Sequence, residues 1–202
     1  DAASNDVPAG SPVVDAAFEF HACTFRDSTD GLMVHGPDVV LDRCIFTGNA
    51  NGASVNGAEV RFENCTFTDN TGDVSVQDGG HAVLVNCSFT PSKVATSGPS
   101  DAWSAWWTVH VRVRFPTGGA AADATVTVRD IKGSTVYTGT TDAHGHISGI
   151  LLLEHVTTGT VRDARTPHTF NATLGMSTNE ASTDISGSTL VTLEIADGSP
   201  PD

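Results

Sequence analysis

Long hydrophobic runs, helical periodicity and positive charge are all scarce in this 202-residue sequence. No apolar run approaches the roughly 18–20 residues that cross a bilayer, so no membrane span is predicted. Apolar residues do not keep the i, i+3, i+4, i+7 spacing beyond a turn or two, which argues against a helical fold. With 10 basic against 24 acidic residues and a net charge of −14, the chain would repel a phosphate backbone, so nucleic acid is not an expected partner.

Motifs for metals and cofactors are also missing. The four cysteines form no CxxC pair and no CxxCH, which argues against zinc spacing and c-type haem. Acidic residues at turns could offer oxygen ligands to Ca²⁺, but no EF-hand or nonapeptide calcium repeat is present, and solvated turns are the simpler interpretation. No cofactor or metal site is therefore predicted, with calcium kept as a weak candidate. The turn residues concerned are Asp27, Asp30, Asp69, Asp73 and Asp78.

The composition that is present indicates a β-rich protein. Thr, Ser, Gly, Asn and Val are plentiful, only 17% of residues are charged, and 39% are hydrophobic, which is typical of many secreted β proteins. The chain opens at Asp1 without a Met or a charged leader, so we expect a mature product or an excised piece. An extracellular or cell-surface location is the prediction.

One phrase recurs about every 21 residues, as TFRDSTDG, CIFTGNANG, CTFTDNTGD and a shortened CSFTPSKV. Apolar residues stand five and three positions before each Cys and two after it. They also stand nine and eleven positions after each of the first three Cys, and this period of two predicts short half-buried strands. The alternation of apolar and polar positions is interrupted once in each repeat, at the residue just before the Cys, where we expect a left-handed bend. The bend residues are Ala22, Arg43, Asn64 and Asn86.

Each repeat thus predicts three short strands, and stacking the repeats would build a continuous core. Residues 18–92 resemble the right-handed parallel β-helix, with about 3.5 coils. Two ladders would line its interior. The cysteine ladder is Cys23, Cys44, Cys65 and Cys87, and the aromatic ladder is Phe25, Phe46, Phe67 and Phe89.

Equivalent residues on neighbouring coils lie about 4.8 Å apart, within the range that a disulfide accepts. Cys23–Cys44 and Cys65–Cys87 bridges therefore remain open beside a ladder of reduced thiols, which is favoured because stacked parallel partners rarely present good bridge torsions.

The repeat then ends, and residues 93–106 read as a linker carrying a Trp cluster. Beyond it, VRVRFPTGGAAADATVTVRDIKGSTVYTGTTDAHGHISGILL resembles the carboxypeptidase-regulatory-like (transthyretin-like) domain, an Ig-like antiparallel β-sandwich expected over 107–197. The resemblance implies a spacer or adhesive module without catalytic residues. The expected fold is all-β, with a short β-helix followed by a sandwich.

Candidate sites are few, and each has a structural alternative. His21, Asp42 and Glu63 should face outward as a ligand or acid/base column, or as a solvated charge ladder. Trp103, Trp106 and Trp107 could stack on sugars, but capping or interface packing is favoured. His144 and His146 could chelate a metal, although a glycine turn is simpler. Asn171, Asn64 and Asn86 head glycosylation sequons, with Asn171 the best exposed.

An open-ended β-helix invites strand addition. We therefore predict a non-enzymatic extracellular structural subunit of a filament or surface layer, assembling head-to-tail with its own copies by stacking or by strand donation. The extension 1–17 is the candidate inter-subunit strand, and 198–202 is a tail. The alternatives are a carbohydrate-binding or polysaccharide-cleaving β-helix, with glycan partners, and a monomeric adhesin or stalk fragment.

Overall fold

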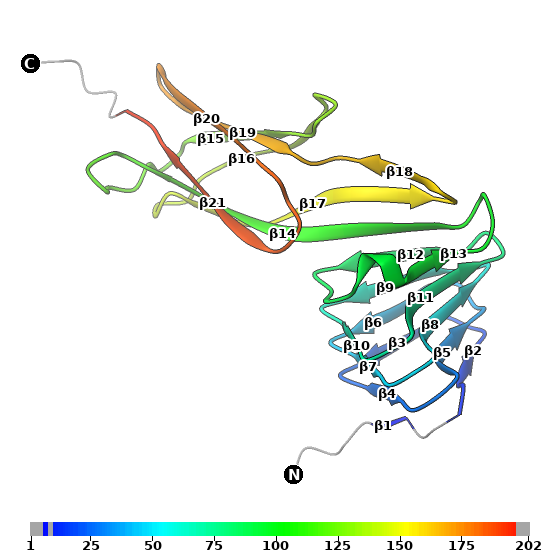
Figure 1. Cartoon of the computed structure of the whole chain (residues 1–202). Coiled ribbons are helices and arrows are strands. Elements are labelled where there is room, and N and C mark those ends of the chain that lie inside the picture. Colours follow the sequence, from blue (N-terminus) through cyan, green and yellow to red (C-terminus); the bar gives the residue numbers. More distant parts are fainter. Residues whose placement is uncertain (1–5, 8–9, 197–202) are drawn as a thin grey trace, which may run out of the picture. The chain divides into compact units, whose positions relative to one another are not determined.

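The computed structural model describes residues 6–7 and 10–196, and these are almost entirely strands and turns (Figure 1). Apart from a single 3₁₀ turn, η1 (Pro91–Lys93), the described residues contain no helix. The chain divides into two compact units. The β-helix unit comprises Asp1–Trp106 with His155–Asp163, and the sandwich unit comprises Trp107–Glu154 with Ala164–Asp202.

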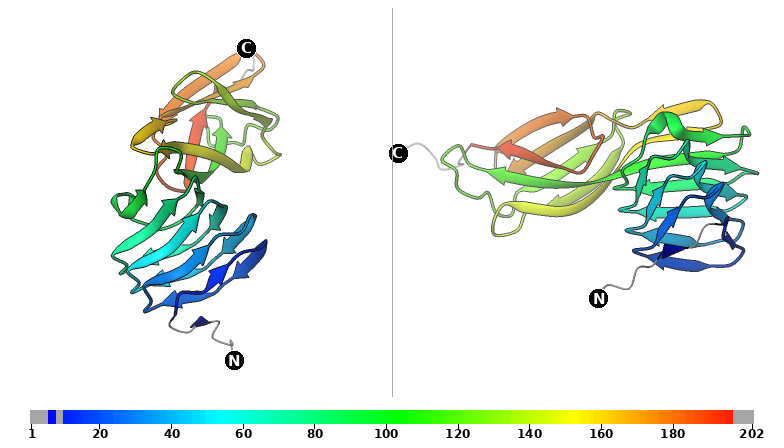
Figure 2. Two further views of the ribbon diagram at one scale, coloured as in Figure 1. Left: turned by 90° about the vertical axis from the view of Figure 1, so that its right-hand side faces the viewer. Right: turned by 60° about the horizontal axis from the view of Figure 1, so that its bottom comes forward.

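The β-helix unit is a right-handed solenoid of about four coils, built from three parallel sheets (Figures 1 and 2). Sheet A contains β1 (Asp6–Val7), β4 (Thr24–Arg26), β7 (Ile45–Thr47) and β10 (Thr66–Thr68). Sheet B contains β2 (Val13–Val14), β5 (Asp30–Val34), β8 (Asn51–Asn56), β11 (Gly72–Gln77) and β13 (Val94–Thr96). Sheet C begins with β3 (Phe18–His21), β6 (Val39–Asp42), β9 (Glu59–Glu63), β12 (His81–Val85) and β14 (Ala102–Arg114).

The predicted three strands per coil and their register are confirmed. Equivalent residues pair across coils, so that Phe46 lies between Phe25 and Phe67. The interruption before each Cys is a left-handed bend, as expected. Ala22, Arg43, Asn64 and Asn86 have φ of 51°, 55°, 53° and 51°.

Aromatic rings form a column inside the coils. The Phe25 and Phe46 rings lie 4.9 Å apart and the Phe46 and Phe67 rings 4.6 Å apart, stacked nearly parallel in both cases. Phe62 meets Phe46 and Phe67 edge-on. Because Phe25, Phe46 and Phe62 are almost fully buried, each contributes roughly 1.5–3 kcal/mol by its removal from water.

An asparagine ladder, which the cysteine-based alignment did not anticipate, crosses the turns after sheet A. The Asn70 carboxamide oxygen accepts a hydrogen bond from the Asn49 backbone N–H at 3.0 Å, and its Nδ2 donates to the Phe46 carbonyl at 3.0 Å. Asn49 repeats the second contact one coil earlier, with Nδ2 donating to the Phe25 carbonyl at 3.1 Å. Both side chains are buried, so they satisfy backbone groups that the turn would otherwise leave unpaired.

Two expectations about the ends of the β-helix are wrong. Residues 93–106 are no linker: β13 pairs in parallel with β11, and the first part of β14 pairs with β12. Alternating Val94, Ala95 and Thr96 continue sheet B despite the Ser/Pro-rich composition around them. Within the extension 1–17, β1 pairs with β4 and β2 with β5 of the same chain, so the described part adds strands in cis. Residues 1–5, 8–9 and the tail 198–202 lie outside the described residues.

The sandwich unit has two layers around its own core. Sheet D is antiparallel, in the order β16 (Thr135–Thr140), β15 (Thr125–Arg129), β19 (His168–Leu174) and β20 (Ser177–Thr183). The facing layer contains β14, β17 (His146–Thr158) and β21 (Thr189–Glu194). Val111, Leu193 and Phe170 from the two layers share one buried cluster. β21 pairs with β14 in parallel, so the sandwich is not antiparallel throughout.

We predict that Asn70→Ala destabilises the β-helix unit by about 2–4 kcal/mol, because the Asn49 N–H and the Phe46 carbonyl would both lose their partner in a buried site. Urea denaturation followed by circular dichroism would measure the loss. Thr68→Ala, two residues away and exposed, is the control and should change the unfolding free energy by less than about 0.5 kcal/mol. Equal effects of the two substitutions would contradict the role of the ladder.

Candidate functional site

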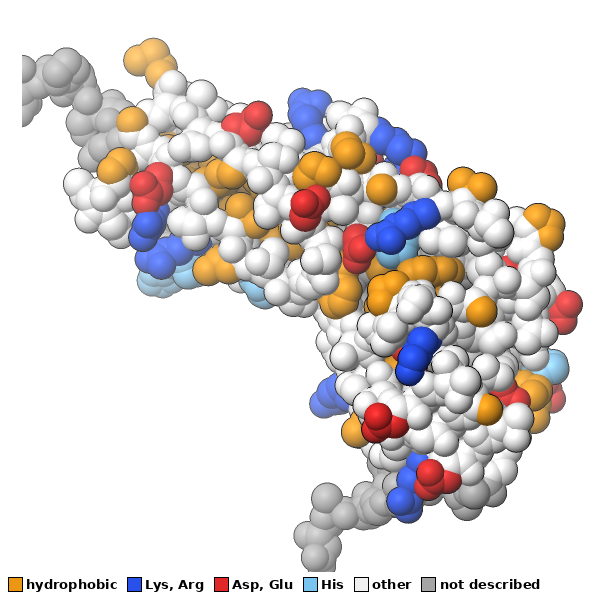
Figure 3. Space-filling model, viewed as in Figure 1, with side chains coloured by type: hydrophobic (Ala, Val, Ile, Leu, Met, Phe, Trp, Pro, Cys, Tyr) orange, Lys and Arg blue, Asp and Glu red, His pale blue; other side chains and the backbone are white. Residues whose placement is uncertain are grey.

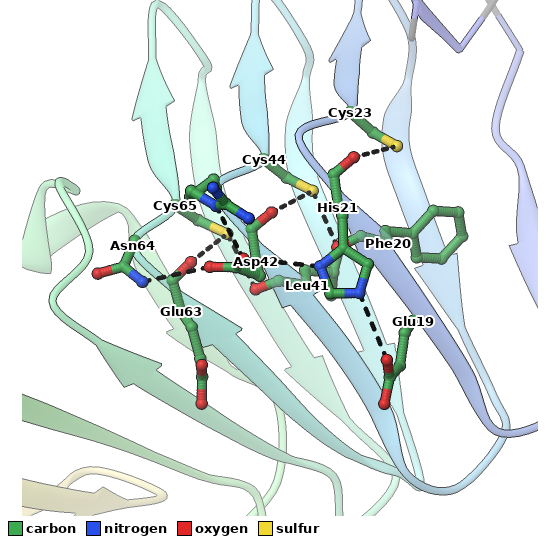
Figure 4. Close-up of polar contacts among 11 residues, drawn as sticks. Glu19, Phe20, His21, Cys23, Leu41, Asp42, Cys44, Glu63, Asn64 and Cys65 are labelled. Atoms are coloured by element: carbon green, nitrogen blue, oxygen red, sulfur yellow. Dashed lines mark hydrogen bonds and ion pairs between the residues drawn. The ribbon is translucent and has the colours of Figure 1, made fainter.

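The outward column of sheet C brings His21 and Asp42 together (Figure 4). His21 Nδ1 lies 3.6 Å from Asp42 Oδ2, and His21 Nε2 lies 3.4 Å from Glu19 Oε2. Glu63 does not join this group, because its carboxylate pairs with Arg61 of its own strand. The predicted group of His21, Asp42 and Glu63 is therefore only partly formed. His21 contacts Asp42, whereas Glu63 forms a separate ion pair with Arg61.

Donors surround the Asp42 carboxylate. Asn64 Nδ2 donates to Oδ1 at 3.2 Å and Arg43 Nε to Oδ2 at 2.8 Å. The hydrogen bond from Asn64, together with Arg43 and His21, holds the pKa of Asp42 below its usual range. A carboxyl group held ionised in this way is suited to structural pairing and is a poor proton donor at neutral pH.

The cysteine ladder consists of four free thiols. Sγ of Cys44, Cys65 and Cys87 lies 3.6, 3.3 and 3.3 Å from the carbonyl oxygen of Phe20, Leu41 and Phe62 respectively, each on the preceding coil. Hydrogen bonding with Cys65, followed by burial, raises the pKa of the Cys44 thiol. The Cys44 thiol therefore stays protonated. All three buried thiols are placed as donors beside the left-handed bends.

Three of the acids in the segments considered for calcium and other metals accept hydrogen bonds from neighbouring groups. Asp30 accepts from Ser54 Oγ at 2.5 Å, and Asp73 accepts from the Thr90 N–H at 2.8 Å. Asp27, Asp69 and Asp78 adopt positive φ at bends. Asp142 accepts from the N–H groups of His144 and His146, which makes that segment a turn. Across residues 6–7 and 10–196, no group of three or more His, Cys, Asp or Glu residues is placed to hold a metal.

The three sequon asparagines lie in different settings. Asn64 and Asn86 occupy the left-handed bends, and Asn64 is exposed. Asn171 is half-buried on the outer side of β19, opposite the fully buried Phe170, and its Nδ2 donates to Thr178 Oγ1 at 3.4 Å. Glycosylation at these positions stays a prediction.

The C-terminal end of the β-helix is closed by the chain itself. Trp103 is buried and meets Phe89 on one side, at 5.8 Å between ring centroids, and His155 on another, at 4.5 Å. His155 belongs to β17, which together with β18 (Val161–Ala164) extends sheet C beyond β14. Trp103 therefore caps the core. Trp106 donates to Ser104 Oγ, and Trp107 donates to Glu154 within the sandwich unit.

A buried carboxylate secures the loop at this closed end. Asp101 accepts hydrogen bonds from the backbone N–H groups of Gly79 at 2.7 Å, Ser97 at 2.9 Å and Gly98 at 2.5 Å. These bonds, that from Gly79 foremost, hold the pKa of Asp101 below its usual range. A pocket of about 320 Å³ lies beside the loop, lined by residues 96–99 and 158–161.

At the N-terminal end of the β-helix, called the open end below, the described residues add no strand beyond the first coil. Among the described strands, β1, β2 and β3 each terminate a sheet. Apolar side chains are exposed here, with Val13 at 53% and Phe18 at 54%. The Phe18 and Phe20 rings lie 4.7 Å apart. Since a sheet edge presents unpaired N–H and C=O groups, this end can accept another strand.

Charged side chains do not gather into a patch on the face shown in Figure 3, where acidic and basic groups are scattered among uncharged ones. Arg43, Arg61 and Arg114 each pair with an acid. With no charged patch on this face, the open N-terminal end is the leading candidate site, and the absence of a nucleic-acid partner stays a prediction.

The comparisons with known proteins identify one module. Residues 14–98 match the family described as "Right handed beta helix region". The match supports the β-helix resemblance, and the structure shows the solenoid over the same residues. No curated protein matches the chain. Nothing in these comparisons supports the carboxypeptidase-regulatory-like resemblance of 107–197, which stays a prediction. Among the described residues no helix is long and apolar enough to cross a membrane.

We predict that Asp101→Asn destabilises the closed end at neutral pH and that the difference from wild type disappears in acid. A carboxyl group whose pKa is lowered by folding stabilises the native state above its unfolded pKa, about 3.9, and this contribution is lost as the pH falls through the lower folded value. Urea denaturation at pH 7 and at pH 3 or below measures the two differences. A gap that stays constant over this range would contradict the assignment.

Proposed function

We propose that this chain is a non-enzymatic extracellular structural protein that assembles through the open N-terminal end of its β-helix. The observation that carries the proposal is the difference between the two ends. One end is covered by Trp103 and His155, whereas the other presents the edge strands β1, β2 and β3 with exposed Val13 and Phe18.

The edge strand β3 is short and carries one acid, but it lacks several other features that protect natural sheet edges against strand addition. Natural sheet edges are commonly blunted by lysine, proline, bulges or a covering segment. β3 has the sequence FEFH, with no lysine or proline, and it pairs with β6 in unbroken register over all four residues. An exposed apolar edge of this kind is a site for association with another β-strand.

Head-to-tail stacking of coils receives less support than joining through the N-terminal end. A coil of one copy could continue another only if all three sheets ended at the same level. At the closed end, sheet A ends at β10, with a single bridge from Thr66 to Ser88 beyond it, and sheet B ends at β13. Sheet C continues through β14, β17 and β18. This uneven end offers no template for the first coil of a neighbour.

The acids of the β-helix unit also fit a structural role. Asp30, Asp73 and Asp101 are buried, and each accepts a hydrogen bond from a side chain or a backbone N–H group elsewhere in the β-helix unit. Asp42 is held ionised by its donors. These carboxylates are used to fasten one coil to the next, which is the role expected in a scaffold.

A carbohydrate-binding module is the second candidate, favoured by the pocket at the closed end. Its lining combines the hydroxyl groups of Thr96, Ser97, Thr158 and Thr160 with Pro99 and Val161. Hydroxyl donors beside small apolar surfaces suit a sugar. Binding to a glycan panel that weakens on Thr158→Val would favour this function over assembly.

We predict that the wild-type chain associates as its concentration rises and that Phe18→Lys prevents it, because the lysine places a charge at the exposed edge. Light scattering coupled to size exclusion measures the mass. The control is Val161→Lys, at an apolar residue of the closed end that is even more exposed than Phe18, at 69% against 54%. That variant should associate like wild type. A wild-type chain that stays monomeric at high concentration, or a loss of association with Val161→Lys alone, would overturn the proposal.

A further inference from the structure

We propose that the partner at the open end is a second copy of this chain, joined by a two-fold axis that pairs β3 with β3 of the second copy, antiparallel and centred on Phe20. This inference rests on the proposed function, because it specifies what the same edge binds. Its basis is the backbone direction of β3 and the order of charges in the sequence FEFH.

Backbone direction decides which residues of β3 can pair across the edge. The Ala22 N–H donates to the Asp42 carbonyl, on the β6 side of the strand. Backbone groups alternate sides along a strand, so Phe18 and Phe20 also direct their N–H and C=O groups toward β6. Glu19 and His21 direct theirs toward the open edge. A strand that adds here must form its hydrogen bonds with Glu19 and His21.

Three antiparallel two-fold registers satisfy this requirement. An axis at Glu19 sets that carboxylate opposite its own copy, which is unfavourable. An axis at His21 sets Glu19 opposite Cys23 of the second copy, beyond the left-handed bend at Ala22, where the strand has ended. An axis at Phe20 sets Glu19 opposite His21 of the second copy, and by symmetry does so twice. Only this register uses both edge-facing residues in reciprocal hydrogen-bonded pairs, which supply four backbone hydrogen bonds.

The side chains agree with the Phe20-centred register. Glu19 and His21 already meet at 3.4 Å within one strand, and their side chains remain 69% and 56% exposed. Opposite residues on an antiparallel pair have Cβ atoms about 4.5–5.5 Å apart, so the acid and the imidazole of different copies fall within reach. On the other face, Phe20 lies at the axis opposite its own copy, and Phe18 is covered beside it.

The occupant is a second copy because β3 is self-complementary. In this four-residue strand a two-fold axis at Phe20 places Glu19 of each copy opposite His21 of the other. The alternate positions carry the aromatic rings of Phe18 and Phe20. An isologous contact of this type closes as a dimer and does not propagate into a fibre. The basic assembly is therefore a two-ended particle, with a closed end and a sandwich unit contributed by each copy.

The test mixes two full-length charge variants. Glu19→Lys alone places a cation opposite His21 of the second copy, and His21→Glu alone places two acids opposite each other. Each variant alone should therefore dimerise about tenfold more weakly than wild type. Mixed one to one, the new lysine at position 19 faces the new glutamate at position 21 of the other copy, and His21 of the first variant faces Glu19 of the second. The mixture should regain wild-type dimerisation by light scattering.

Rescue in the mixture is specific to contacts between copies, because the contact between positions 19 and 21 within each strand stays altered. Glu180→Lys, an exposed acid of the sandwich unit, is the matched charge control and should dimerise like wild type. One outcome would overturn the two-fold register and leave the proposed function standing. In that outcome wild type associates, Phe18→Lys blocks the association, and the mixture of charge variants shows no rescue. A monomeric wild type would overturn both, and masses beyond a dimer would replace the closed contact with a propagating one.

Discussion

Backbone hydrogen bonds between equivalent residues of successive coils hold the β-helix together, and the rest of the unit adjusts to keep them in register. A coil needs corners, and every corner takes some backbone groups out of the ladders. The thiols of Cys44, Cys65 and Cys87 supply donors at one corner, and the carboxamides of Asn49 and Asn70 do so at another. The columns of identical residues are thus a solution to the same hydrogen-bonding requirement, repeated at each level.

The same requirement explains why the two ends differ. At the closed end, hydrogen bonding passes from β12 to β14 and on to β17 and β18, while Trp103 and His155 cover the core below. At the N-terminal end the described strands stop at β1, β2 and β3, and half of the β3 backbone has no strand to pair with. Charges follow this division: buried acids serve the turns, and the exposed acid and imidazole of FEFH remain for an edge contact.

Much of the β-helix follows from the sequence because its information is local and repeated. The Cys and Phe columns gave the strands and the left-handed bends, since a period of two and its interruption are visible without knowing distant contacts. The asparagine ladder left a weaker signal: Asn49 and Asn70 each stand five positions after a Cys, but serines replace them at positions 28 and 92. His21 and Asp42 were expected on one outward column, whereas the pairing of Glu63 with Arg61 depends on rotamers that spacing does not determine.

Features that depend on residues far apart in the chain could not be predicted in this way. β13 lies in a Ser/Pro-rich segment whose strand character comes from pairing with β11. The parallel pairing of β21 with β14 joins residues about 80 positions apart, and no local sequence pattern predicts it. The cap is similar, since nothing near Trp103 indicates that His155 completes it.

The discontinuity of the β-helix unit has a consequence for the order in which the protein folds. Residues 155–163 belong to this unit, yet residues 107–154, part of the sandwich unit, precede them in the chain. A ribosome that makes the protein from its N-terminus releases all the coils well before the strand that covers them. The nascent solenoid therefore waits, with the Trp103 side of its core uncovered, for some fifty further residues to be synthesised. Pausing or truncation within that interval would leave a nearly complete β-helix whose two ends are both uncovered. This is the form of the protein most prone to aggregation.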